Sequence, residues 1–151
     1  MKKTSDNPAK ILCVDDSPAM LSLFEKIVRD EHLEYFSASN GSDAIECAIS
    51  KHPDLIFLDI VMLGMDGFAV MRELQKDART AGIPVVFASS KNQKADHAWA
   101  KMQGAKGFIT KPIDEQMVVE EIYKFVPRAV PARTPNPGTG SDSPTSADDT
   151  E

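Results

Sequence analysis

The stretch ILCVDDSP, residues 11–18, indicates the fold class of this 151-residue chain. Its first four residues are apolar without interruption, which is typical of a strand buried on both faces of a parallel sheet. Ser17 and Pro18 then provide an N-cap and a proline at the first helical position, and apolar residues follow at helical spacing from Met20 to Val28. A buried strand that leads into a capped helix is the repeating unit of an α/β domain.

The same alternation continues along the chain. Apolar runs at 33–38, 55–58, 84–88 and 106–110 are each followed by a segment with helical periodicity. Five strands and five helices in strict alternation imply βαβ crossovers, and therefore a parallel sheet with helices on both faces. The predicted fold class is a doubly wound, five-stranded α/β domain with five helices.

Composition divides the chain into three parts. Residues 1–8 form a short lead-in, residues 9–126 the folded domain, and residues 127–151 an acidic tail rich in proline, serine and threonine. A tail with five prolines and no aromatic residue cannot bury enough apolar surface to offset its ordering entropy. We therefore predict a disordered tail that could serve as a tether, a solubility segment or a partner-binding strand.

Charge and hydropathy exclude several classes of protein. The net charge of −6 argues against nonspecific nucleic-acid binding, which needs clustered lysine and arginine. No apolar run approaches the roughly 20 residues of a membrane-spanning helix, and polar residues follow Met1 where a signal peptide would carry its apolar region. We expect a cytoplasmic protein without membrane insertion, with Cys13 and Cys47 as reduced, packed thiols.

Polar side chains come directly after the predicted strands. Asp15 and Asp16 follow the first apolar run, Asp59 the third, Ser89 the fourth and Lys111 the fifth. Ligands of open α/β sheets bind outside the carboxyl ends of the strands. We therefore expect these five side chains to converge on one edge of the sheet.

Three converging carboxylates need a counter-charge, because they repel one another unless protons or a cation offset them. Oxygen donors without a soft ligand nearby favour Mg²⁺ over Zn²⁺. Mg²⁺, the ammonium of Lys111 and the hydroxyl of Ser89 together suit a phosphoryl group, whose transfer depends mainly on positioning and charge neutralisation. Asp59, alone at its strand end, can act as the nucleophile.

This pattern resembles the receiver domains of response regulators, the family of the chemotaxis regulator CheY. The match covers about residues 9–126, and its motifs are Asp15-Asp16, Asp59 with the loop to Gly67, Ser89-Ser90 and Lys111-Pro112. The resemblance implies a CheY-like, flavodoxin-like fold and a two-component phosphorelay. In such a relay a histidine kinase, for example a CheA-like kinase, would transfer a phosphoryl group to Asp59.

The resemblance also implies a role for each matching residue of the site. Asp16, the carboxylate of Asp59 and the backbone carbonyl of Val61 would bind Mg²⁺, with Asp15 helping through water. Lys111 would pair with the phosphoryl oxygens, before a proline where a cis peptide bond often occurs in the family.

Switching and output are implied in the same way. On activation the hydroxyl of Ser89 would move toward the phosphoryl group, and the ring of Phe108 would turn inward. The output surface would comprise the fourth helix, the fifth strand and the fifth helix, and it would contact a downstream motility or signalling protein. Its candidate exposed contacts are Lys91, His97, Lys101 and Gln103.

A narrower resemblance concerns the pathway. Residues 99–112 and 59–62 are similar to single-domain regulators of chemosensory systems that control type IV pili and twitching motility. Such regulators lack an output domain and act by protein contact. We therefore expect a role in chemotaxis or pilus-based motility, for a protein that is a monomer or a weak dimer.

Three residues depart from the usual family pattern. Leu63 replaces the proline usual after Met62, which leaves the loop beside Asp59 less rigid. Ser90 replaces a commoner alanine or glycine, and Phe108 lacks the hydroxyl of the tyrosine found in many members. The extra hydroxyl of Ser90 affects the lifetime of the phosphorylated state. Because Phe108 has no hydroxyl to form a hydrogen bond, we expect the switch to be read mainly through packing.

Two other functions compete with a phosphoacceptor. Phosphatases of the haloacid dehalogenase class also use a strand-end aspartate and Mg²⁺, but they need a second carboxylate two residues later, where this chain has Val61. The main alternative is a receiver-like docking or scaffold module with little dependence on phosphorylation, although the acid pair and the acceptor are all present. We predict that the chain is not an enzyme, beyond assisting its own phosphoryl transfer and hydrolysis.

Several other residues have simpler interpretations. Trp99 is expected to pack within the fold rather than to contact a partner. We place the remaining polar residues of interest on solvated surface: His32, His52, His97, Glu120 and Glu121.

Overall fold

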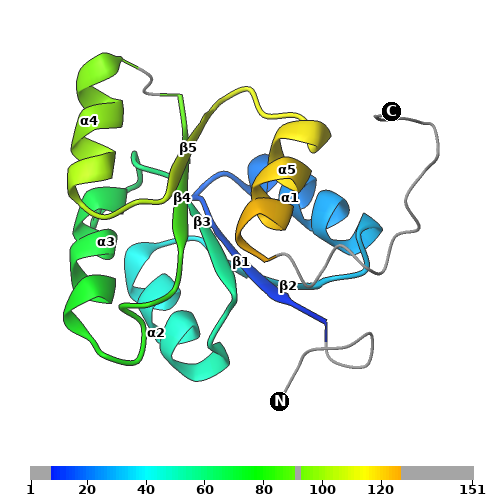
Figure 1. The fold of residues 1–151 in the computed structure, drawn as a ribbon, viewed down its shortest axis with the longest axis horizontal. Coiled ribbons are helices and arrows are strands. Elements are labelled where there is room, and N and C mark those ends of the chain that lie inside the picture. The colour runs from blue at the N-terminus through cyan, green and yellow to red at the C-terminus, as the bar shows by residue number, and fades with distance from the viewer. Residues whose placement is uncertain (1–7, 91–92, 127–151) are drawn as a thin grey trace, which may run out of the picture.

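The computed structural model describes residues 8–90 and 93–126, which form one parallel sheet between two layers of helices (Figure 1). The strands are β1 (Lys10–Val14), β2 (Glu34–Ala38), β3 (Leu55–Leu58), β4 (Val85–Ser89) and β5 (Gly107–Thr110). The helices are α1 (Pro18–Asp30), α2 (Gly41–Lys51), α3 (Gly67–Lys76), α4 (Lys94–Met102) and α5 (Glu115–Phe125). The strand order is β2-β1-β3-β4-β5, which confirms the doubly wound fold.

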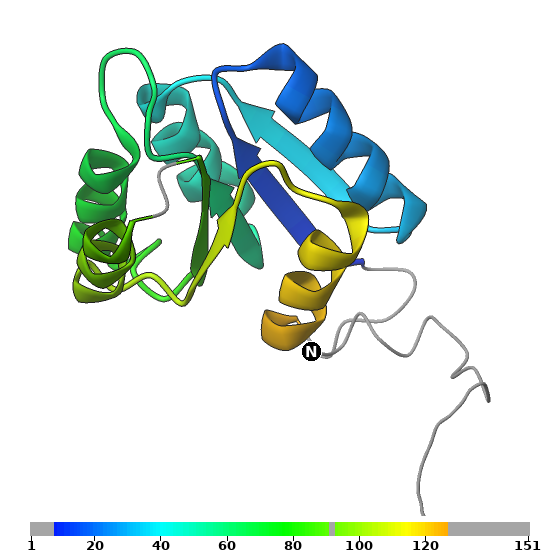
Figure 2. The same ribbon diagram turned by 90° about the horizontal axis from the view of Figure 1, so that it is seen from above.

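Each face of the sheet has its own hydrophobic core. Helices α1 and α5 cover one face, and α2, α3 and α4 cover the other (Figure 2). Within β1, Ile11 and Cys13 belong to the first core, and Leu12 and Val14 to the second. The uninterrupted apolar run in the sequence therefore reflects a strand that is buried on both sides.

The start of two helices depends on residues next to the strand ends. The hydroxyl of Ser17 accepts a hydrogen bond from the backbone N–H of Met20 at 3.3 Å, so the predicted N-cap of α1 is confirmed. Asp66 caps α3 in the same way, accepting from the N–H of Ala69 at 2.9 Å. These hydrogen bonds fix where α1 and α3 begin after the loops that follow β1 and β3.

Strand boundaries differ from the predicted ones by one residue. Strand β2 begins at Glu34 although Leu33 is buried beside it, and β5 begins at Gly107. Pro84 lies before β4 because it has no N–H to donate to the ladder, although its carbonyl accepts from the N–H of Ile56.

The prediction for Glu121 was wrong. Its side chain is only 13% exposed, because α5 packs over the edge strand β5 at Gly107, which has no side chain to exclude it. One carboxylate oxygen of Glu121 accepts from Lys124 at 3.1 Å, and the other is buried. Glu120 is exposed, as predicted.

The other surface predictions were largely correct. His32, His52 and His97 are exposed, and the first two follow helices α1 and α2 with φ of 61° and 52°. Trp99 packs edge-on against Phe68 but remains 44% exposed.

The remaining predictions concern the cysteines, membrane insertion and the two ends of the chain. Cys13 is buried, Cys47 is half-buried, and both are free thiols. No helix in the described part of the chain is long and apolar enough to cross a membrane. Residues 1–7 and 127–151 lie outside the described residues, so the lead-in and the tail stay predictions.

Gly67, the first residue of α3, provides a test of how closely this helix packs on the end of β3. An added Cβ would overlap the carbonyl oxygen of Asp59 and lie 2.8 Å from the Cα of Ile60, both of them backbone atoms. Gly67→Ala should therefore lower the free energy of unfolding by about 1–3 kcal/mol in urea titrations. Gly82→Ala is the matched control, because its added Cβ meets no described atom within 4 Å. Equal stability of the two variants would contradict the close packing of Gly67 on Asp59.

Candidate functional site: a carboxylate cluster at the strand ends

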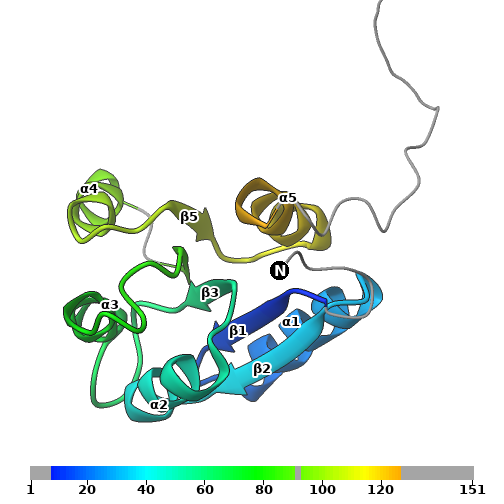
Figure 3. The same cartoon turned by 60° about the horizontal axis from the view of Figure 1, so that its bottom comes forward.

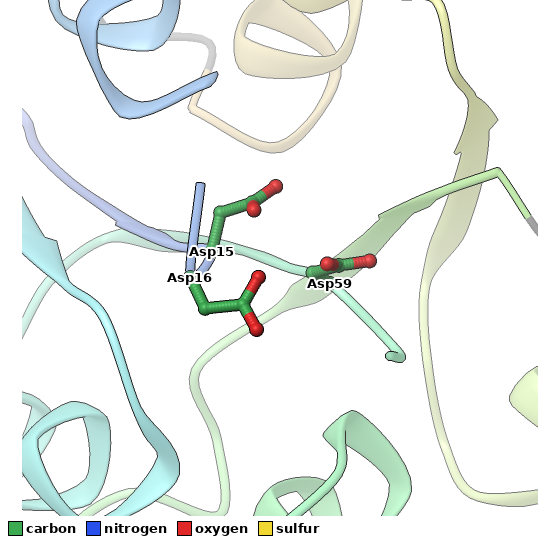
Figure 4. Close-up of side chains that lie close together, drawn as sticks. All are labelled: Asp15, Asp16 and Asp59. Atoms are coloured by element: carbon green, nitrogen blue, oxygen red, sulfur yellow. The ribbon is translucent and has the colours of Figure 1, made fainter. Parts of the chain in front are cut away.

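Asp15, Asp16 and Asp59 form a carboxylate cluster at the carboxyl ends of β1 and β3 (Figure 4). One carboxylate oxygen from each residue lies within 4.8 Å of those of the other two. The strands are neighbours in the sheet, with Val14 opposite Leu58, and the N–H of Asp59 donates to the carbonyl of Val14 at 3.0 Å. Strand pairing thus brings together residues that are 44 positions apart in the sequence.

The three carboxylates differ in their access to water. Asp15 and Asp59 are buried, with 1% and 5% of their surface exposed, whereas Asp16 is exposed. Asp16 accepts a hydrogen bond from the N–H of Leu63, 3.3 Å away in the loop after β3. Two of the carboxylates that could bind a metal ion are therefore buried and the third is exposed. An ion could enter the site on the side of Asp16.

Lys111 provides the positive charge of the site. Its backbone N–H donates to the carbonyl of Ser89 at 3.0 Å, which holds the end of β5 beside the end of β4. Its ammonium donates to Asp15 at 2.7 Å and lies 3.5 Å from a carboxylate oxygen of Asp59. The peptide bond between Lys111 and Pro112 is cis, as the family resemblance implied.

Asp15 also connects the site to helix α1. While one carboxylate oxygen of Asp15 accepts from Lys111, the other accepts from the N–H of Ser17 at 2.9 Å. Each oxygen of the buried carboxylate therefore has a hydrogen-bond partner, and the two partners hold it in place from both sides.

Burial and repulsion raise the pKa of Asp59. The larger cause is burial, which penalises the charged carboxylate, and the second is the negative charge of Asp15. The charge and hydrogen bond of Lys111, with a hydrogen bond from the N–H of Val61, offset this only in part. The favourable interactions of ionised Asp59 with Lys111 and Val61 therefore do not fully offset the cost of burying its charge beside Asp15.

The pKa of Lys111 is also raised. Burial alone would lower it, but the hydrogen bond to Asp15 and the charges of Asp59 and Asp15 outweigh burial. Lys111 therefore keeps its positive charge at neutral pH.

The predicted switch residues occupy different positions relative to the cluster. Ser89 is completely buried as the last residue of β4, and Ser90 beside it is exposed. Phe108 lies farther from the strand ends, half-buried on β5, with its ring facing α4. Ser89 is therefore at the strand ends where the cluster lies, and Phe108 is not.

The predicted output contacts are only partly exposed. His97 and Lys101 are exposed on α4, whereas Gln103, the C-cap of this helix, is half-buried. Lys91 lies outside the described residues. Figure 3 shows β5 between α4 and α5, so His97 and Lys101 belong to the side of the domain proposed for output.

Sequence reasoning missed two features of the site. It did not find the contact of Gly67 with the backbone of Asp59, although an Asp-Gly pair before a helix is a signal for a capped, closely packed turn. It also predicted His97 as an exposed residue of the output surface but not that its imidazole stacks on the ring of Phe108. No local signal could have shown that contact, since α4 and β5 meet only in the folded domain.

The donor set of the cluster fits a hard divalent cation. All three side chains offer carboxylate oxygens, no thiol or imidazole belongs to the cluster, and the exposure of Asp16 allows water to complete the coordination. Of the predicted ligands, the structure brings the three carboxylates together. The role of the Val61 carbonyl stays a prediction.

Comparison with known families assigns the domain. The model of the response regulator receiver domain matches residues 11–123, which is most of the chain. The chain belongs to the response regulator receiver family. It is therefore a signalling domain of the two-component type.

Two single-domain-sized relatives come from Pseudomonas aeruginosa. The chain is 40% identical to Protein PilH over 114 residues, which are 76% of this chain and 94% of PilH. It is 28% identical to Protein PilG over 131 residues, which are 87% of this chain and 96% of PilG. The response regulator PleD of Caulobacter vibrioides is also 40% identical, but the match covers only 25% of PleD.

Solved receiver structures share the fold. The chemotaxis protein CheY4 of Vibrio cholerae matches with a TM-score of 0.75 and 23% identity, covering 79% of this chain and 99% of CheY4. The receiver domain of sensor histidine kinase PA1611 from Pseudomonas aeruginosa, solved with a magnesium ion in its active-site cleft, matches with a TM-score of 0.74 and 18% identity. That match covers 80% of this chain and 98% of the PA1611 domain.

The raised pKa of Asp59 predicts how stability depends on pH without metal. The ionised carboxylate destabilises the fold, so this penalty should be absent at low pH and appear as pH rises through the pKa of folded Asp59. Asp59→Asn should therefore be more stable than wild type at neutral pH, with the difference vanishing in acid. Urea titrations in the presence of a chelator, across a pH series, measure this. A wild-type advantage at neutral pH would contradict the assigned electrostatics.

Proposed function

We propose that this protein is the phosphoacceptor of a two-component phosphorelay. A histidine kinase would transfer a phosphoryl group to Asp59, and the chain would then signal by contact with a downstream protein. The observation that supports this most directly is the position of Asp59, buried beside two other carboxylates and 3.5 Å from the Lys111 ammonium. A group of this kind can accept an anion only where positive charge is already in place.

The residues of the site divide the chemistry of transfer. A carboxylate oxygen of Asp59 would attack phosphorus, and the leaving imidazole of the kinase histidine would take the bonding electron pair. The ammonium of Lys111, 3.5 Å from a carboxylate oxygen of Asp59, would pair with the phosphoryl oxygens as they approach. Mg²⁺, bound by Asp16, Asp59 and the Val61 carbonyl with Asp15 helping through water, would neutralise the remaining negative charge.

Signalling would follow from a change in Ser89 and Phe108. The buried hydroxyl of Ser89 would move toward the phosphoryl group, and the Phe108 ring would turn inward. The output surface would be that of α4, β5 and α5, where His97 and Lys101 are exposed. We propose a cytoplasmic protein, a monomer or weak dimer, whose folded part is residues 9–126.

The pathway we propose is chemosensory control of motility, most specifically of type IV pili. Support comes from the resemblance of residues 99–112 and 59–62 to regulators of such systems and from the similarity to PilH and PilG. The kinase would then be CheA-like. The alternative function is a docking or scaffold module with little dependence on phosphorylation. The next experiment distinguishes it from a phosphoacceptor.

Phosphorylation can be tested with a small phosphodonor. Incubation with acetyl phosphate and Mg²⁺ should add one phosphoryl group to the intact mass, and the addition should disappear in Asp59→Asn or with a chelator. Asp30→Asn, which changes an exposed carboxylate on α1, is the matched control and should behave as wild type. An unmodified wild-type mass would support the docking module instead.

The pathway can be tested by phosphotransfer preference. Each histidine kinase of the source organism is first autophosphorylated and then mixed with the chain, and the initial rate of transfer is compared. We expect the fastest transfer, by at least about tenfold, from the kinase of a pilus chemosensory system, since each tenfold needs only about 1.4 kcal/mol of discrimination. Faster transfer from an unrelated sensor kinase would contradict the pathway while leaving the phosphoacceptor role intact.

A further inference from the structure

Two aromatic rings stack where helix α4 crosses strand β5. The imidazole of His97 lies over the ring of Phe108, with centroids 4.0 Å apart and planes inclined by 23°. His97 is exposed, whereas Phe108 is half-buried. The imidazole therefore covers the outer face of the Phe108 ring.

Ring contacts connect Phe108 to the region beside Asp59. Gly67 packs on the carbonyl of Asp59, and the next residue, Phe68, meets Phe87 edge-on with centroids 5.2 Å apart. Phe87 is completely buried in β4 and lies opposite Phe108 in the sheet, with ring centroids 6.4 Å apart. Aromatic contacts thus run from the start of α3 to the ring proposed to switch.

The first ring of this series, Phe68, and the last, Phe108, each contact a residue of helix α4. Trp99 meets Phe68 edge-on at 6.2 Å, and His97, two residues earlier, stacks on Phe108. Ala100 is the one buried residue of α4. Ring contacts therefore join α4 to both α3 and β5.

Space beside the stack allows the rings to move. A solvent-open pocket of about 250 Å³ lies between α4 and β5, and the side chains of Lys101 and Lys106 form part of its lining. It is bordered by both stacked rings and by Ala100, Ala105 and Gly107. Neither ring is therefore confined to its present position by close packing on all sides.

We propose that His97 is a positioning residue that holds Phe108 in its resting orientation and so opposes the switch. This inference rests on the proposed function, in which Phe108 turns inward when Asp59 is phosphorylated. We take the described position of Phe108, half-buried against His97, as the resting arrangement. Turning the ring away from α4 would break the stack, so the stack would stabilise this arrangement alone. Losing the stack should shift the population toward the activated arrangement and tighten binding of a phosphoryl mimic at Asp59.

The affinity for beryllofluoride tests this proposal on the full chain with Mg²⁺. Removing an aromatic pair changes an equilibrium by about two- to tenfold, so His97→Ala should lower the apparent Kd by that factor in fluorine NMR titrations. His97→Phe keeps a ring in place and should bind as wild type does. Lys94→Ala, an exposed change on the same helix, should also leave the Kd unchanged.

A double-mutant cycle separates the stack from other effects of the substitution. In a Phe108→Leu background, His97→Ala should no longer change the Kd, because the ring it acts on is missing. An unchanged or higher Kd in His97→Ala alone would overturn the role of His97. If wild type itself bound no beryllofluoride, the proposed function would fail first, and this inference with it.

A measurement on the wild-type protein does not depend on any variant folding. In the resting state the imidazole protons of His97 should show an upfield ring-current shift from Phe108, and beryllofluoride should remove it. An imidazole signal that stays at its resting position when the site is saturated would overturn the proposal.

Discussion

The attraction between the Lys111 ammonium and the buried carboxylates of Asp15 and Asp59 keeps this site in its observed form. Two carboxylates at the end of adjacent strands repel each other, and burial makes the repulsion stronger. A single ammonium, 2.7 Å from one and 3.5 Å from the other, offsets part of that repulsion and leaves Asp59 with a raised pKa. With three carboxylates and one ammonium the site keeps a net negative charge, which is the condition for taking up a cation. In our proposal that cation, together with Lys111, would then bind the phosphoryl group.

The doubly wound sheet creates this condition by its topology. Neighbouring parallel strands end at the same edge, so Asp15 and Asp59 follow β1 and β3 side by side, and Lys111 is held to Ser89 at the ends of β5 and β4. The cluster is consequently built from strand ends on a rigid sheet, while Asp16 and the loop of Leu63 leave it open to solvent.

Communication with the protein surface needs a second set of contacts. Gly67 joins the backbone of Asp59 to α3, and aromatic rings from α3, β4 and β5 meet α4, where the proposed output surface lies. In our proposal the stacking of His97 on Phe108 stabilises the resting orientation of the Phe108 ring. In that proposal the free energy that separates two positions of the Phe108 ring would set how strongly the receiver domain responds to phosphorylation.

The sequence by itself determined the fold class, the convergence of the polar residues and the identity of the proposed acceptor. Continuous apolar runs occur where strands are buried on both faces, and each chemically important residue directly follows such a run, so local pattern was sufficient. Tertiary structure decided what depends on contacts between distant segments. The burial of Glu121 against Gly107 of β5 and the stack of His97 on Phe108 each join elements whose local sequences contain no sign of the partner. The sequence brought Lys111 to the cluster, but only the fold decided that its ammonium bonds Asp15 at 2.7 Å and lies 3.5 Å from Asp59.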